Sequence, residues 1–403
     1  MEALREGSPL RILAVATYYR PYLSGLTVYL QRLAETLALW GHQVTVLTAQ
    51  WPVEAPREEV CRGVKVVRAP VWFRAFKGVV APGLPRQLWQ LGEQAEVVWL
   101  VLPQAESALL AWLAKRRLKK PLLVSYLCDV TLGRKPWLWC VQKSLEASHR
   151  RAMGWADAVV ALSHEYAATS PLLRQLATVT VIPPPVPTLT PDPARVIALQ
   201  ERLQLPPGTP VVGWVGRVSR EKGLDVLARA MPLVWAARPE VRVVCVGPRE
   251  EVAGERRYLR QVEERVRDFG SRWQFVGTLA EEELAAFYGC CAVLAFPSVN
   301  RTEAFGMVQL EAMGAGTPVV ASDLPGVREP VQRTGMGLLV PPQDPQALAT
   351  ALLRVLAERP AFSSLPVAPL QAYAPAAVTQ HLLCLFVRLS RRAPSTSTAG
   401  ALE

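Results

Sequence analysis

Apolar, β-branched segments alternate with helical segments along the chain, and this alternation restricts the possible folds more than any other feature. The first cycle runs from a strand at residues 11–17 through a loop and a helix at 27–39 to a strand at 43–48. This order indicates a parallel sheet covered by helices. Further strands of the first half are expected at residues 63–68, 97–102, 122–126, 158–162 and 178–182.

A proline-rich segment interrupts the pattern, with prolines at 183, 184, 185, 187, 191 and 193. Successive prolines deny the chain helix and ladder hydrogen bonds, so a stiff linker is expected. The alternation then restarts, with strands expected at 211–215, 241–246, 273–275, 293–296, 318–321 and 337–340 and helices at 223–235, 258–269, 281–289, 305–313 and 345–356. We therefore predict two Rossmann-like, doubly wound α/β domains that face a central cleft.

The expected boundaries follow from these patterns. Residues 1–185 form the N-terminal domain, 186–207 the proline-rich linker region and 208–365 the C-terminal domain. Residues 366–392 form a crossover with a final helix near 375–389, and 393–403 are expected to be a disordered tail, because they are rich in Ser, Thr, Ala and Gly.

Composition narrows the class of protein. Half of the 403 residues are hydrophobic and 20% are charged, which suits large cores and excludes a disordered chain. The longest apolar stretch, Val97–Leu113, contains Gln104 and Glu106 and is expected to be a strand followed by a helix, not a membrane span. With no secretory signal recognised, the chain is expected in the cytoplasm, and a peripheral position at the inner membrane face stays open.

The net charge of +11 favours anionic partners such as nucleotides or phospholipid headgroups. Because no basic run is interleaved with aromatic residues, a nucleic-acid partner is not expected. The seven cysteines include no C-x-x-C and are expected to be buried, reduced thiols. The four histidines lack metal-ligand spacing, so no metal is expected; the sequence leaves the oligomeric state open.

The segment 296–320 carries the strongest candidate site. A strand ends near Pro297 and a helix is expected to start near Phe305, so the first free amides, those of Phe305, Gly306 and Met307, can bind anions or sugar hydroxyls. Carboxylates at 303 and 311 can each accept hydrogen bonds from vicinal hydroxyls. The alternative interpretation makes Glu303 a first-turn acid that favours the helix dipole, and makes Glu311 a solvated residue.

A second segment, 213–225, leads from the end of a strand into a helix. Arg217 and Lys222 are the cations expected to reach a cleft and to hold a diphosphate, whose charge grows as it leaves. Lys222 is the only lysine after Lys143. In the first domain the loop 19–27, which contains Ser24 and Gly25, leads to a helix N-terminus. That N-terminus can contact phosphate. A plain turn between strand and helix is an equal alternative.

Together these motifs resemble glycosyltransferase family 4, retaining enzymes of the GT-B fold. The family's G-R-x-x-x-x-K-G matches residues 216–223, and its E-x-x-x-x-x-x-x-E matches 303–311; the segments 41–46, 323–329 and 337–342 are also similar. The resemblance implies transfer of a sugar from a nucleotide diphosphate sugar to an unidentified acceptor on the first domain. That acceptor is a glycolipid, a polysaccharide or a small molecule. No cofactor is implied, and no Asp-x-Asp metal motif occurs.

The resemblance also implies residue roles. Glu303 binds hydroxyls of the donor sugar, and Glu311 binds the ribose hydroxyls. Arg217 and Lys222 bind the diphosphate. The implied donor-binding set is completed by Ser24, Gly25, Gly216, Ala304, Phe305, Gly306 and Met307.

Two positions depart from the family pattern. The first loop of the family usually has paired glycines, where this chain has Ser24 and Gly25, and this departure is mild because serine can still donate a hydrogen bond. The second is more serious. Leu127 stands where relatives commonly have a histidine that contacts the transferred sugar, while Asp129, two residues later, is retained as a candidate catalytic residue. Leucine can neither donate a hydrogen bond nor carry a proton. Two alternatives therefore stay open: a donor-binding relative with impaired catalysis, and another GT-B-like enzyme such as an epimerase or a phosphorylase.

Overall fold

The computed structural model describes residues 8–75, 78–132, 135–249, 255–363 and 367–392. The expected tail at 393–403 lies outside these residues. The chain divides into two compact units. Unit 1 comprises residues 1–161, 170–182 and 378–403, and unit 2 comprises 162–169 and 183–377. Helix α15 (Pro375–Arg392) thus begins in unit 2 and continues in unit 1, where the Phe386 ring lies edge-on to Trp99 with centroids 5.6 Å apart.

Unit 1 contains an eight-stranded sheet of order β10-β9-β8-β7-β1-β2-β4-β3 among the described residues. Its pairs are parallel except for the edge strand β3 against β4. The strands are β1 (Arg11–Val15), β2 (Gln43–Ala49), β3 (Glu58–Cys61), β4 (Val64–Ala69), β7 (Val97–Leu102), β8 (Leu122–Tyr126), β9 (Ala158–Ala161) and β10 (Thr180–Val181). Every residue of β7 and β8 is buried, which explains their continuous apolar sequence.

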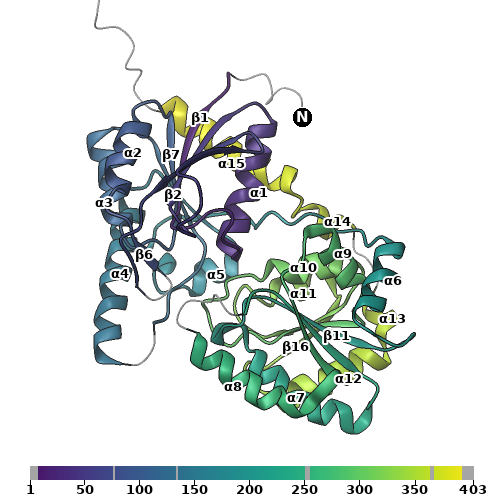
Figure 1. Cartoon of the computed structure of the whole chain (residues 1–403). Coiled ribbons are helices and arrows are strands. Elements are labelled where there is room, and N and C mark those ends of the chain that lie inside the picture. Colours follow the sequence, from purple (N-terminus) through teal and green to yellow (C-terminus); the bar gives the residue numbers. More distant parts are fainter. Residues whose placement is uncertain (1–7, 76–77, 133–134, 250–254, 364–366, 393–403) are drawn as a thin grey trace, which may run out of the picture. The chain divides into compact units, whose positions relative to one another are not determined.

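Several further elements belong to unit 1, and Figure 1 labels its helices α1, α2, α3 and α4. They are α1 (Gly25–Leu39), α2 (Leu84–Gly92), α3 (Ser107–Trp112), the π-helical turn η2 (Leu113–Arg117), α4 (Pro136–Trp155), the turn η3 (Leu173–Gln175) and the small hairpin β5 (Phe73–Ala75) and β6 (Gly78–Val80). The strand and helix expected within Val97–Leu113 are confirmed as β7 and α3.

In its described part, unit 2 contains a six-stranded parallel sheet of order β13-β12-β11-β14-β15-β16. Its strands are β11 (Val211–Val215), β12 (Arg242–Val246), β13 (Trp273–Gly277), β14 (Val293–Phe296), β15 (Val319–Ser322) and β16 (Gly337–Val340). The chain adds β12 and β13 on one side of β11 and then crosses to add β14, β15 and β16 on the other. The point where the order reverses lies between β11 and β14, and ligands of such sheets bind there.

Helices cover both faces of this sheet, as Figure 1 shows for α7, α8 and α12 on one side and α9, α10 and α11 on the other. Their bounds are α7 (Leu224–Ala237), α8 (Arg256–Val266), α9 (Glu281–Cys290), α10 (Met307–Gly314), α11 (Glu329–Thr334) and α12 (Pro345–Ala357); α5 (His164–Thr169), α6 (Pro193–Arg202), α13 (Arg359–Phe362), α14 (Val367–Gln371) and the turns η4 (Arg220–Lys222) and η5 (Arg267–Arg272) complete the unit. Trp214 of β11, Leu227 of α7 and Leu352 of α12 are buried together in one apolar core.

The linker expectation needs one correction, because the proline-rich segment contains helix α6. Proline is tolerated at the first helical position, where its missing N–H has no intrahelical partner. Pro193 occupies that position, and the Asp192 side chain accepts a hydrogen bond from the amide of Ala194, at 3.0 Å. We had interpreted Pro193 as a helix breaker, whereas it begins one.

Two further expectations are answered by the described residues. None of the seven cysteines forms a disulfide within the described residues. Only Cys128, Cys245, Cys290 and Cys291 are buried; Cys140 is exposed and the other two are half-buried. Among the described helices none is both long enough and apolar enough to cross a membrane.

Candidate functional site

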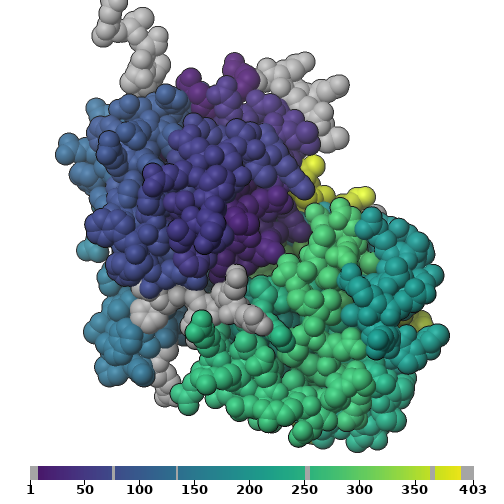
Figure 2. Space-filling model, in the orientation of Figure 1, coloured from purple at the N-terminus to yellow at the C-terminus, as the bar shows by residue number. Residues whose placement is uncertain are grey.

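The loops that follow β11 and β14 lie at the same edge of the unit 2 sheet, on either side of its reversal point. The first loop carries Gly216, Arg217 and Lys222, and the second carries Glu303. The expected cations and the first expected carboxylate therefore follow neighbouring strands. Figure 2 shows the surface of the chain coloured by residue number.

A glycine holds the two loops together. Gly223 has a φ of 65°, and a Cβ atom at this position would lie 1.9 Å from the carbonyl oxygen of Pro297. Only glycine permits both the left-handed conformation and this close approach. The amide of Val299 also donates to the carbonyl oxygen of Glu221 at 3.0 Å. The backbone therefore fixes the distance between the cationic loop and the carboxylate loop.

Lys222 and Glu303 form an ion pair across these loops. Their side chains are 19% and 13% exposed, and the ammonium group lies 5.4 Å from the centroid of the Phe296 ring. Arg217 lies 3.7 Å from Glu221, four residues further along the same loop. Two cations and two carboxylates thus share one partly shielded site, where their interactions are stronger than in open solvent.

Hydrogen bonds from neighbouring backbone and side-chain groups stabilise the loop that carries Glu303. The Asn300 side chain accepts from the amide of Thr302 at 3.0 Å, and the carbonyl of Asn300 accepts from the amide of Glu303 at 3.2 Å. The Arg301 guanidinium donates to the carbonyl of Thr169, and the Tyr166 hydroxyl donates to the carbonyl of Arg301 at 3.1 Å. Helix α5, which is distant in sequence, therefore supports the loop from within unit 2.

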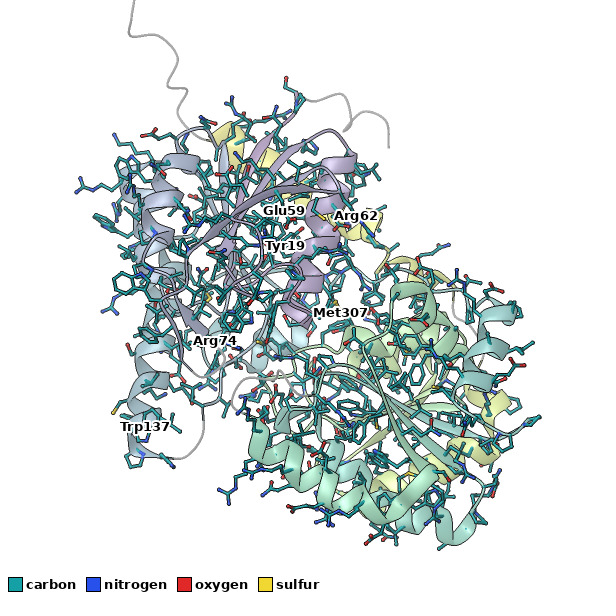
Figure 3. The ribbon with its side chains drawn as sticks, in the orientation of Figure 1. Tyr19, Glu59, Arg62, Arg74, Trp137 and Met307 are labelled. Atoms are coloured by element: carbon teal, nitrogen blue, oxygen red, sulfur yellow. The ribbon has the colours of Figure 1, made fainter. Side chains whose placement is uncertain are left out.

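Helix α10 begins at Met307, labelled in Figure 3, and not at Phe305 as expected. Gly306 is its N-cap residue with a φ of 85°, and a Cβ there would lie 2.6 Å from the Phe296 ring. The helix therefore starts only after the left-handed residue. The outward amides of the first turn belong to Met307 and Val308. The side chain of Phe305 is buried against Tyr373, so only its backbone remains for a ligand.

Glu311 is buried, which contradicts the interpretation that it is solvated. Its exposed fraction is 4%, and its Oε2 accepts a hydrogen bond from the Tyr288 hydroxyl at 3.0 Å. The carbonyl of Tyr288 in turn accepts from the hydroxyl of Thr317 at 2.6 Å. A buried carboxylate needs such donors, because an isolated charge in the interior is strongly unfavourable. Glu303, paired with Lys222, is likewise not a simple first-turn acid.

In unit 1 Ser24 caps helix α1. Its hydroxyl accepts from the amide of Thr27 at 3.2 Å, and the Thr27 hydroxyl accepts from the amide of Ser24 at 2.8 Å. This capping box places Gly25 at the first helical position, two residues earlier than the start we expected. The loop after β1 therefore presents a helix N-terminus, as the sequence indicated.

The segment after β8 carries the other candidate residues of unit 1. The Asp129 Oδ1 accepts hydrogen bonds from the hydroxyls of Tyr126, at 2.9 Å, and Ser170, at 2.7 Å. Burial and the neighbouring Asp129 raise the pKa of Tyr126 well above its ordinary value, so its hydroxyl keeps the proton that it donates. Leu127 is 4% exposed, and its amide donates to the carbonyl of Leu102 at 3.1 Å.

Several residues of these networks were not identified from the sequence. Tyr288 and Tyr166 lie far along the chain from the carboxylate and the loop that they support, and nothing local indicates either contact. Glu221 lies four residues after Arg217, but only Glu221 belongs to the helical turn η4, so helical spacing does not indicate this ion pair.

Two parallel α/β sheets in one chain, the second with paired cations and carboxylates at its reversal point, define the GT-B class of glycosyltransferases. Solved structures agree on the fold. Sucrose-phosphate synthase from Thermosynechococcus elongatus superposes with a TM-score of 0.78 at 24% identity, covering 94% of this chain and 99% of that one. The Anabaena protein HepE, in complex with UDP and glucose, gives 0.74 at 20% identity, with the same coverage of both chains.

Sequence comparison gives the family. The model described as "Glycosyl transferase 4-like domain" matches residues 24–185, and "Glycosyl transferases group 1" matches 209–358. A D-inositol 3-phosphate glycosyltransferase from Xylanimonas cellulosilytica is 31% identical over 83% of this chain and 84% of its own. A GDP-mannose-dependent alpha-(1-6)-phosphatidylinositol monomannoside mannosyltransferase from Mycolicibacterium smegmatis is 29% identical over 86% and 89%. The chain belongs to glycosyltransferase family 4 and is a hexosyltransferase that acts on nucleotide sugars.

Proposed function

We propose that this enzyme transfers a hexose from a nucleotide diphosphate sugar to an acceptor with retention of the anomeric configuration. The observation that carries the proposal is the ion pair of Lys222 and Glu303 at the reversal point of the unit 2 sheet. Each charge of the pair compensates the other, so neither is buried alone. When the donor binds, the ammonium turns to the diphosphate and the carboxylate accepts from sugar hydroxyls.

The remaining unit 2 residues complete the donor site. Arg217, oriented by Glu221, binds the diphosphate together with Lys222. Glu311, held by Tyr288, accepts hydrogen bonds from the ribose hydroxyls. The first backbone amides of α10 contact phosphate or sugar, and Ala304 and Phe305 contribute backbone only, since both side chains are buried. Gly216 lets the donor approach the backbone after β11.

Unit 1 supplies the acceptor side in this proposal. The α1 N-terminus, at Ser24 and Gly25, contacts phosphate through backbone amides. Asp129, fixed by two hydroxyl donors, contacts the transferred sugar. These assignments come from the family motifs, and the rigid hydrogen bonding of each residue supports them.

The proposed reaction needs no cofactor and no metal, because two cations neutralise the leaving group. The bond between the anomeric carbon and the diphosphate oxygen breaks, with the electron pair leaving on the phosphate. The acceptor oxygen bonds to the same face of the sugar. The departing phosphate takes the acceptor proton, so the products are the glycoside and the nucleoside diphosphate.

The relatives suggest which substrates to test first. One similar structure holds UDP and glucose, and one relative's name specifies GDP-mannose, so UDP- and GDP-sugars are the first donors. Two relatives are named for inositol-containing acceptors, so inositol phosphates and phosphatidylinositol glycolipids are the first acceptors.

The experiment is a thermal-shift screen of UDP-, GDP- and ADP-sugars, followed by an assay of sugar release from the donors that stabilise the protein. A ligand that binds only the native state raises the unfolding temperature. We expect one nucleotide sugar to raise it and to be turned over. Stabilisation by none of them would contradict the proposal.

Leu127 favours a second candidate, a donor-binding relative with impaired catalysis. Its side chain is apolar and buried at the position where relatives commonly carry the sugar-contacting histidine. This candidate requires tight nucleotide binding without sugar release, no rescue by acceptors and no recovery in Leu127→His. Release of sugar by the unaltered chain excludes it.

A further inference from the structure

The N-terminal end of α4 exposes an apolar run. Residues 136–141 read Pro-Trp-Leu-Trp-Cys-Val, six consecutive non-polar residues at the start of a 20-residue helix. Trp137 is 53% exposed, Trp139 59% and Val141 40%. Large apolar side chains clustered at a surface mark interaction sites more often than isolated ones do. None of these residues belongs to the proposed transfer site.

Helix geometry, together with side-chain exposure, indicates that the N-terminal end of α4 projects into solvent. Successive residues are rotated by about 100°, so Trp137 and Trp139 point to nearly opposite sides of the axis. Both are more than half exposed, and so is the Lys143 side chain, at 52%. Solvent therefore reaches most of the circumference of this helix end. Figure 3 labels Trp137 at this end of α4.

The charges beside the run are positive. Lys135 and Lys143 flank it; Lys143 forms an ion pair with Glu146 at 2.7 Å, whereas Lys135 is exposed. The positive end of the helix dipole lies at the same end. The whole chain carries a net charge of +11. A second copy of the chain would bring the same cations against this end, so self-association is disfavoured, and an anionic surface is favoured.

We propose that the helix end at residues 135–143, the α4 tip, docks on the surface of an anionic phospholipid bilayer. Tryptophan prefers the boundary between headgroups and acyl chains, because its ring is apolar and its N–H is polar. Lys135 and the positive end of the helix dipole attract anionic headgroups, while Trp137, Trp139 and Val141 enter the boundary layer. Membrane contact of this kind needs no spanning helix.

Docking of the α4 tip also affects the acceptor side of unit 1, an inference that rests on the proposed function. The tip begins six residues after Asp129, at the end of the segment that follows β8. Docking therefore holds the acceptor-side loops of unit 1 near the headgroups. An acceptor carried on a lipid is then presented to the enzyme at the bilayer surface.

The test is co-sedimentation with vesicles of phosphatidylcholine mixed with phosphatidylglycerol, compared with phosphatidylcholine alone. We expect the unaltered chain to bind the mixed vesicles, less strongly as salt increases. The double variant Trp137→Ser/Trp139→Ser should bind at least about tenfold less, because binding scales with the buried apolar area. Trp72→Ser is the matched control, since Trp72 is 76% exposed elsewhere in unit 1, and it should bind as the unaltered chain does.

Two results would overturn the proposal: no binding of the unaltered chain to mixed vesicles, or equal losses in the double variant and the control. A concentration-dependent dimer that the double variant abolishes would assign the tip to a second copy instead. Donor hydrolysis without vesicles should be unchanged in the double variant. This readout separates failure of the docking from failure of the proposed function, because a chain without transferase activity can still bind vesicles.

Discussion

At the scale of single residues, the two carboxylates of the candidate site have different surroundings. Glu303 is paired with Lys222 at a partly exposed position, whereas Glu311 is buried and accepts a hydrogen bond from Tyr288. In the proposed function the first exchanges partners when a donor binds. The second, already fixed, binds a constant part of the donor, the ribose.

The replacement of each carboxylate by its amide tests these roles. Glu311→Gln should weaken binding of the nucleoside diphosphate by about 1–3 kcal/mol, because the amide loses the charge that strengthens hydrogen bonds to the ribose. Glu303→Gln should weaken it less and should chiefly alter the choice among donor sugars. Calorimetric titration with the nucleoside diphosphate and with several donor sugars measures both effects. The reverse order would overturn the assignment.

His149 provides a test of the interior of unit 1. Its Nε2 accepts a hydrogen bond from the amide of Gln104 at 3.2 Å, and burial lowers its pKa from 6.5 to about 4. In the unfolded chain His149 therefore binds a proton below about pH 6.5, whereas in the folded chain it binds one only below about pH 4. Stability should fall across this window as the pH decreases, by about 3 kcal/mol in total.

The check is urea denaturation at a series of pH values. His149→Gln should flatten the loss of stability between pH 6.5 and 4, while the exposed His381→Gln should leave it unchanged. An identical pH dependence in the unaltered chain and in His149→Gln would show that this histidine is not held neutral.

The residues that the sequence could and could not indicate differ in a physical way. Lys222 and Glu303 belong to short segments whose spacing is set by the local path from strand to helix, so the sequence contains the signal. Tyr288 supports Glu311 across 23 residues, and Tyr166 supports the loop of Arg301 across 135. Such contacts depend on how helices pack, which no local spacing specifies.

At the scale of elements, the approach of the loops after β11 and β14 depends on Gly223. Any side chain there must displace the carbonyl of Pro297 and adopt a φ of 65°. Local propensity predicted the strands on either side, but not the contact between their loops. Proline also misled the prediction of α6, because its position within the first helical turn decides whether it ends or begins a helix.

Gly223→Ala tests this contact. We expect it to lower the stability of the protein by more than 2 kcal/mol, on the order of the strain and steric costs known for such positions. Gly208→Ala is the matched control, since Gly208 has a φ of 76° but no neighbour within 4 Å, and it should cost about 1 kcal/mol. Thermal unfolding and donor affinity measure both variants. Equal losses would show that the close approach to Pro297 does not matter.

At the scale of the whole molecule, two α/β units are recognisable from the sequence because each repeats the alternation of strand and helix. The parallel strands of both sheets follow from that alternation, because parallel strands need long crossover connections, usually a helix; the antiparallel edge strand β3 was not among the predicted strands. The assignment of residues 162–169 to unit 2 was not foreseeable, because it depends on contacts such as that of Glu165 with the amide of Gly326, at 2.9 Å.

The stereochemistry of transfer is a property of the complete enzyme. We expect the sugar released from the donor by water to have, at first, the anomeric configuration that it had in the donor. Proton NMR of the anomeric signals during the first turnovers measures this before the anomers equilibrate. An initially inverted product would contradict the retaining mechanism, although not the family assignment.

The proposed function requires that Lys222 bind and stabilise the leaving diphosphate, and donor turnover by Lys222 variants measures this role. Lys222→Ala should lose donor affinity and rate together, by about 2–4 kcal/mol in kcat/KM. Arg220→Ala, which removes an exposed cation two residues away, should have little effect. A Lys222→Ala variant that turns over the donor as fast as the unaltered chain would contradict the account.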